Sequence, residues 1–112
     1  MPMIAREVFC TLQFEATHRW ETAPDRVAYL RNSHRHVFHV VCQASVKHEN
    51  RDIEFIMLKN DVLRYCRSCY ESQYDLGEMS CEMIAQDILD TFPVLYSVEV
   101  SEDGENGAIV SR

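Results

Sequence analysis

The stretch HRHVFHVVCQASVK (residues 34–47) alternates in side-chain character over its length, and REVFCTLQFEA (residues 6–16) does the same. Alternation with a period of two is typical of a β-strand with one buried face. Residues 37–42 are apolar or aromatic on both faces, which predicts that the later strand is covered on both sides at its centre. Two long strands early in the chain therefore decide the fold.

Two helices are predicted after these strands. Apolar residues recur at helical spacing over 58–69 and again over 81–92. Ser80 is a good N-cap for the second helix, and Pro93 ends its pattern. Residues 17–33, by contrast, have no sustained period, and we expect a long loop there.

A second pair of strands closes the chain. Residues 94–100 alternate, turn residues follow at 103–107, and a short apolar segment covers 108–110. The order β-β-α-α-β-β, with strands and helices segregated, is typical of the α+β class. We expect a single domain, 1–112, since the chain is too short for two cores.

Composition and charge exclude several classes of protein. The chain is 46% hydrophobic with a net charge of −7, which argues against disorder and against non-specific binding to nucleic acid. No run of about 18 apolar residues is present, so no membrane span is expected. Arg6 and Glu7 lie where a signal peptide needs an apolar run, and the five cysteines lack the spacing of a disulfide framework. We therefore expect a cytoplasmic protein with reduced thiols.

Three histidines form a candidate metal site. His34 and His36 leave the same face of one strand, roughly 6.5–7 Å apart along it. His18 lies just past the first strand, which would neighbour the second in a hairpin. Three imidazoles with an open fourth position suit zinc better than magnesium or calcium. The alternative from spacing alone is a polar patch beside a loop histidine.

Two other features admit both a functional and a structural interpretation. Cys66 and Cys69 have redox or zinc-type spacing, but both also fit the apolar face of the first helix. Glu102 has the parity of Val98 and Val100, so it is expected to point inward at the end of its strand. A carboxylate there can accept two parallel hydrogen bonds from a guanidine-like ligand edge, unless it is simply a solvated hairpin acid.

The motifs FEATH (residues 14–18) and SHRHVFHV (residues 33–40) resemble the zinc motif of the 6-pyruvoyl-tetrahydropterin synthase and 6-carboxy-tetrahydropterin synthase family, which reads FxAAH, a loop, then HGHxF/Y. EFIMLK (residues 54–59) is similar to the family's DFxxLK. MSCEMIA (residues 79–85) resembles PTxENxA, and VEVSE (residues 98–102) resembles the closing VxVxE. The resemblance covers almost the whole chain.

The resemblance implies a tunnelling fold, a four-stranded antiparallel sheet backed by two helices, with sheets joined around a central barrel. It implies a homo-oligomer, usually a hexamer, with active sites between subunits. It also implies Zn²⁺ held by His18, His34 and His36, and a pterin ring anchored by Glu102. The family's substrate is 7,8-dihydroneopterin triphosphate, and its members include enzymes of queuosine biosynthesis.

This sequence departs from the family pattern where protons are transferred. Leu30 stands at the place of the catalytic cysteine, and no histidine follows His48 to supply the family's second catalytic group. Glu71 and Asp75 are weak candidates for that role, in a shortened segment that also holds Glu78. The metal and ring-binding parts are retained, whereas the acid–base part is lost or rebuilt.

Three functions remain open from the sequence. The first is a zinc-dependent lyase acting on a dihydropterin triphosphate, with a carboxylate as proton shuttle. The second is a zinc hydrolase or deaminase of a purine- or pterin-like substrate on the same scaffold. The third is a non-catalytic protein that binds a nucleotide- or pterin-like ligand. A shared fold does not choose among them, because function resides in the site.

Overall fold

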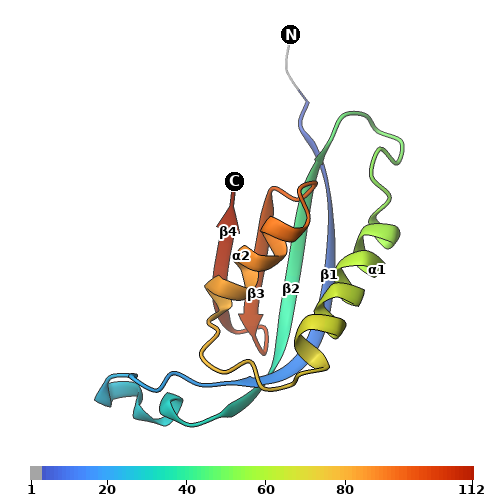
Figure 1. Ribbon diagram of the computed structural model, residues 1–112. Helices are drawn as coiled ribbons and strands as arrows, with labels where there is room; N and C mark the ends of the chain where they lie inside the picture. Colours follow the sequence, from blue (N-terminus) through green and yellow to red (C-terminus); the bar gives the residue numbers. More distant parts are fainter. Residues whose placement is uncertain (1–3) are drawn as a thin grey trace.

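The computed structural model describes residues 4–112 and contains one four-stranded antiparallel sheet (Figure 1). Its strands occur in chain order: β1 (Arg6–His18), β2 (His34–Val46), β3 (Ser97–Glu102) and β4 (Asn106–Ser111). Each strand pairs with its neighbour in sequence, and the two helices are inserted between β2 and β3. The predicted α+β class and element order are confirmed.

Strands β1 and β2 are the two longest strands of the sheet and pair as a hairpin. Its register runs from Arg6 opposite Val46 to His18 opposite His34. Inward-facing residues therefore meet in rows, and the rings of Phe14 and Phe38 stack with centroids 5.3 Å apart. This register places the last residue of β1 beside the first residue of β2.

Helices α1 (Phe55–Cys66) and α2 (Cys81–Thr91) lie on one face of the sheet (Figure 1). The core forms between that face and the helices; its fully buried large side chains include Phe14, Phe38, Val40, Val62, Ile84, Ile88, Val98 and Val100. The prediction that β2 is covered on both sides is wrong for the single chain. Val37, His39 and Val41 on its other face are only half-buried, because neighbouring strands shield them but neither helix covers them.

Helix α1 begins at Phe55, three residues before the expected start. The Glu54 carboxylate caps it by accepting from the backbone N–H groups of Ile56 and Met57 at 2.8 and 3.1 Å. The helix continues into a π turn, η2 (Arg67–Glu71). Cys66 is buried and Cys69 half-buried against the core, and both thiols are free, as are the other three cysteines.

The second helix is bounded as the sequence predicts. The Ser80 hydroxyl accepts from the Met83 N–H at 3.2 Å, and the helix ends before Pro93. Strand β3 begins at Ser97 rather than at residue 94. Residues before it form a turn in which the Leu95 N–H donates to the Phe92 carbonyl at 3.0 Å.

The expected loop after the first strand is shorter and more ordered than predicted. Strand β1 continues to His18, and the 3₁₀ turn η1 (Asp25–Arg31) lies within the connection. This connection projects from the end of the sheet where β1 ends and β2 begins (Figure 1). None of the helices in residues 4–112 is long and apolar enough to cross a membrane.

Candidate metal centre

Three histidine rings converge at the end of the sheet from which the connection projects. His18 is the last residue of β1, and His34 and His36 share the inward face at the start of β2. Their ring centroids are 4.6 Å apart for His18 and His34, 5.3 Å for His18 and His36, and 5.0 Å for His34 and His36. The structure thus brings together the three histidines that the sequence singled out.

Each of these rings is oriented by a hydrogen bond at Nδ1. His18 Nδ1 lies 2.7 Å from the Met79 carbonyl, and His34 Nδ1 lies 2.8 Å from the Asn32 carbonyl. A carbonyl oxygen only accepts, so these two nitrogens carry the proton and donate. Nδ1 of each neutral ring is then the donor, and the Nε2 lone pair is free to bind a metal.

The third ring is held by a carboxylate. His36 Nδ1 lies 2.7 Å from Asp103 Oδ2, and Asp103 Oδ1 accepts from the Val37 N–H at 3.0 Å. These two hydrogen bonds hold the pKa of Asp103 below its usual range, so the carboxylate is ionised and accepts from His36. A carboxylate behind a ligand histidine fixes its tautomer and raises its basicity.

The inner nitrogens of His18 and His36 have no hydrogen-bond donor. Both Nε2 atoms are buried, His18 is only 7% exposed, and the one polar group close to them is the Glu102 carboxylate, which is itself an acceptor. Leaving a buried polar atom unsatisfied costs about 1–3 kcal/mol, so such atoms normally have a partner. A cation between the rings would satisfy them, and imidazole nitrogens are ligands that suit zinc.

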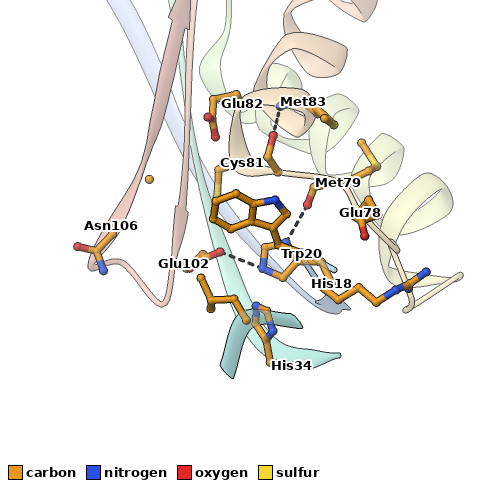
Figure 2. Close-up of a pocket in the computed structure, with 14 residues that line it drawn as sticks. His18, Trp20, His34, Glu78, Met79, Cys81, Glu82, Met83, Glu102 and Asn106 are labelled. Carbon is orange, nitrogen blue, oxygen red and sulfur yellow. Dashed lines mark hydrogen bonds and ion pairs between the residues drawn. The ribbon is translucent and has the colours of Figure 1, made fainter. Parts of the chain in front are cut away.

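Glu102 reaches into the same cluster. Its Oε2 lies 2.9 Å from His18 Nε2, and its Oε1 lies 3.5 Å from His36 Nε2 (Figure 2). One atom from each of His18, His34, His36 and Glu102 lies within 4.8 Å of all the others. Two acceptors facing each other repel, so either a proton on Nε2 or a metal ion is needed between them. The structure therefore offers four ligand atoms that could hold one metal ion.

A cavity of about 490 Å³ opens beside the histidine cluster (Figure 2). Its apolar wall consists of Trp20, Leu30, Met79 and Met83, and its acidic residues are Glu78, Glu82 and Glu102. His18 and His34 also line it. A ligand in the cavity therefore has an apolar surface beside it and the histidine cluster at one end.

The weak catalytic candidates are not brought to this cavity. Glu71 accepts from the Glu15 N–H at 3.0 Å, and Asp75 accepts from the Gly77 N–H at 2.9 Å. Neither residue lines the cavity, whereas Glu78 from the same segment does. Arg35, which stands between His34 and His36 where the motif of the resembling family has glycine, forms an ion pair with Glu15 at 3.1 Å and does not line the cavity.

Cys81 does not replace the missing cysteine. It lines the cavity, but burial, together with the charges of Glu102 and Glu82, raises the pKa of its thiol to about 12. The protonated thiol is a poor nucleophile and a poor base near neutral pH.

A scan against protein-family models and a search of curated proteins found no match to this chain. A search of solved structures found matches over the whole chain. The Caenorhabditis elegans 6-pyruvoyl tetrahydropterin synthase aligns with a TM-score of 0.69 at 15% identity, covering 100% of this chain and 99% of that one. The fold is that of 6-pyruvoyl tetrahydropterin synthases.

Two Plasmodium 6-pyruvoyl tetrahydropterin synthase structures also match this fold over nearly the whole chain. The P. falciparum enzyme gives a TM-score of 0.69 at 15% identity, covering 96% of this chain and 98% of that one. The P. vivax enzyme gives a TM-score of 0.70 at 14% identity, covering 98% of this chain and 99% of that one. In two further P. vivax structures a glutamate described as a catalytic residue is replaced. The tunnelling fold and the likeness indicated by the motifs are confirmed, and at this identity the comparison shows the fold alone.

We expect Asp103→Asn to weaken zinc binding about tenfold, because loss of a carboxylate behind a ligand histidine typically costs 10- to 100-fold in metal affinity. Asparagine tolerates the positive φ of 56° at this turn position, so the backbone should be retained. Chelator competition measures the affinity. Glu105→Gln, in the same hairpin, is the matched control, and equal affinities in the two variants would contradict this role for Asp103.

Proposed function

We propose that the protein is a zinc-dependent enzyme of the 6-carboxy- or 6-pyruvoyl-tetrahydropterin synthase type, acting on a dihydropterin or a related purine-like ligand. The observation that carries the proposal is the set of three imidazoles, each held at Nδ1, whose inner nitrogens meet beside an open cavity. Acquisition of zinc by the purified protein and turnover of a dihydropterin would support it.

His18, His34 and His36 are the proposed zinc ligands. When bound there, zinc supplies a Lewis acid that stabilises negative charge on a substrate oxygen. The histidines are held by acceptors from three different segments, at Met79, Asn32 and Asp103. This outer shell fixes the rings before any ligand enters, which lowers the entropy lost on binding.

Glu102 has two proposed roles that exclude each other at any one moment. In the structure its carboxylate is within reach of the cluster as a fourth ligand. The resemblance instead implies that it anchors the far edge of the pterin ring. A carboxylate 2.9 Å from His18 Nε2 cannot also accept from the far edge of a ring whose side chain binds the metal. We propose that Glu102 completes the site without ligand and leaves it when a ligand binds.

Proton transfer is assigned to carboxylates of the cavity wall. Leu30 offers no proton acceptor, and the Cys81 thiol stays protonated. Glu78 and Glu82 line the cavity, so they are better placed than Glu71 or Asp75. A glutamate is described as a catalytic residue in the P. vivax enzyme, which supports a catalytic role for a carboxylate in this fold.

The second candidate function is non-catalytic binding of a pterin- or purine-like ligand. It is favoured by the absence of a cavity-lining cysteine with a lowered pKa and by Leu30 in the wall, as seen in residues 4–112. Incubation of zinc-loaded protein with 7,8-dihydroneopterin and its triphosphate separates the two functions. Slow product formation that His34→Ala abolishes supports the enzyme, and tight binding without product supports the binding protein.

We propose that the protein assembles into a homo-oligomer, as a hexamer or a smaller ring, in the cytoplasm. Strands β1 and β4 are the two edges of the sheet, and edge strands offer unpaired backbone groups to a second copy. On the face away from the helices, Phe9 of β1 and Ile109 of β4 are each 65% exposed. Five free thiols agree with a reducing compartment.

Light scattering on the purified protein should give a mass larger than that of a dimer. Phe9→Glu combined with Ile109→Glu should lower it, because each new charge would be buried against the next copy. Met57→Glu, an exposed change on α1, is the control. A mass of about 13 kDa for the unaltered protein at micromolar concentration would contradict the assembly.

A further inference from the structure

The edge segment (residues 74–79) runs beside the end of β1, next to the candidate metal centre. Its backbone forms a parallel bridge with the strand, between Asp75 and Thr17. The Thr17 N–H donates to the Tyr74 carbonyl at 2.7 Å, and the Thr17 carbonyl accepts from the Leu76 N–H at 2.8 Å. The edge segment is therefore fastened to the last turn of the ladder before the candidate ligand of β1.

The edge segment holds both the backbone around His18 and the ring of His18. Arg19 donates its N–H to the Gly77 carbonyl at 2.8 Å, so the residues on both sides of His18 are bonded to this segment. Two residues after Gly77, the Met79 carbonyl lies 2.7 Å from His18 Nδ1 (Figure 2). One short piece of backbone thus fixes where His18 lies and which way its ring points.

A tight turn carries the edge segment from β1 to the ring of His18. The Met79 N–H donates to the Leu76 carbonyl at 3.3 Å, and Gly77, inside the turn, has a φ of 61°. Glycine adopts this φ without strain. Leu76 is 8% exposed and packs in the core, which anchors the start of the turn. A change in the turn would therefore move the Met79 carbonyl relative to the ring.

Asp75 stabilises this turn from outside the cavity. Its Oδ1 accepts from the Gly77 N–H at 2.9 Å, which is the hydrogen bond of an Asx turn. Arg19 Nη1 lies 3.7 Å from the same oxygen, but the Asp75 side chain is 63% exposed, and exposed ion pairs contribute little. The hydrogen bond to Gly77 is thus the contact through which Asp75 acts.

We propose that Asp75 is a positioning residue for the metal centre. Through Gly77 and the Met79 carbonyl it keeps the His18 ring oriented, with the proton on Nδ1 and Nε2 toward the cluster. A proton held on Nδ1 leaves the Nε2 lone pair for a metal ion. This role rests on the proposed zinc site, and it replaces the catalytic role considered for Asp75 from the sequence.

Nitrogen-15 NMR of the histidine rings tests the positioning role in the zinc-free and the zinc-loaded protein. Asp75→Ala removes the acceptor of the Gly77 N–H, whereas Asp75→Asn keeps an oxygen in its place. In Asp75→Ala the His18 Nδ1 proton should exchange with water severalfold to about tenfold faster, as expected for a weakened hydrogen bond. The Nδ1 protons of His34 and His36, held by other segments, should be unaffected, and Asp75→Asn should behave like the unaltered protein.

Zinc affinity gives a second readout on the same variants. Asp75→Ala should lower it about three- to tenfold, less than the 10- to 100-fold typical for loss of a group that contacts a ligand directly. The visible absorption bands of the cobalt-substituted protein should change in Asp75→Ala and not in Asp75→Asn. Gln73→Ala, an exposed change just before the edge segment, is the matched control.

The outcomes separate this role from the function on which it rests. Unchanged exchange of the His18 proton in Asp75→Ala overturns the positioning role and leaves the zinc site in place. Equally faster exchange in all three rings also overturns it, because Asp75 would then only support the fold. Failure of the unaltered protein to bind zinc overturns the proposed function, and proton exchange in the zinc-free protein still decides whether Asp75 orients His18.

Discussion

His34→Ala should abolish stoichiometric zinc binding, whereas the unaltered protein should carry about one zinc per chain. The substitution removes one of three imidazoles whose inner nitrogens converge within a few ångströms of each other. Two histidines and a carboxylate remain, so we expect the affinity to fall at least about 100-fold. Elemental analysis and competition with a chromophoric chelator measure the content and the affinity.

The matched control is His39→Ala. His39 lies on the same strand but faces away from the cluster, where Gln13 Nε2 is 3.3 Å from its Nδ1. Zinc should raise the midpoint of thermal unfolding of the unaltered protein and of His39→Ala, but not that of His34→Ala, because only a folded-state ligand stabilises by mass action. Unaltered zinc content in His34→Ala would contradict the proposed site.

Glu102→Gln should weaken zinc binding by roughly tenfold or more, since a neutral amide oxygen is a poorer ligand than a carboxylate. Cobalt substitution gives a second readout, because loss of the fourth protein ligand changes the visible absorption bands of a tetrahedral site. Glu99→Gln, three residues earlier on β3 and outside the cluster, is the control.

The role implied by resemblance predicts a different result for the same variant. If Glu102 only anchors the ring, zinc affinity stays unchanged while pterin affinity falls about 10- to 150-fold, the equivalent of a charge-assisted contact. Zinc binding equal to that of Glu99→Gln would therefore contradict the metal-ligand role. If Glu102 alternates between binding the metal and binding the pterin ring, Glu102→Gln should lower both the zinc affinity and the pterin affinity.

The long hairpin was predictable because its periodicity is strong. Alternation over residues 6–16 and 34–47 sets which side chains face the core, and one register satisfies both strands. That register places His18 opposite His34. Spacing made the three histidines candidates but left a polar patch open as the alternative, and the resemblance of the motifs favoured the metal site. The boundary at His18 was missed because residues beyond 16 lose the alternation.

Helix boundaries depend on side chains that hydropathy does not record. Phe55, Ile56 and Met57 are exposed apolar residues in the first turn of α1, so they weaken the amphipathic pattern there. The helix begins at Phe55 because the Glu54 carboxylate binds two N–H groups. A glutamate four residues before Leu58, the first buried position, was the available signal.

The rest of the site depends on contacts between distant segments. Glu102 approaches His36 because β3 pairs with β2 so that Glu102 lies opposite Phe38, and no pattern within either strand fixes that register. Asp103 reads in the sequence as a turn residue, yet its side chain holds His36 and Val37. The acceptor for His18 is a backbone carbonyl at Met79, which side-chain identity cannot reveal.

Anomalous diffraction at the zinc edge from crystals of the zinc-loaded protein is the most direct test of the central claim. The account predicts one strong peak per chain at roughly 2.0–2.1 Å from Nε2 of each of His18, His34 and His36. Glu102 should lie at a similar distance in the ligand-free crystal. A peak elsewhere, or no peak between these three rings after zinc loading, would contradict the claim that they form a zinc site.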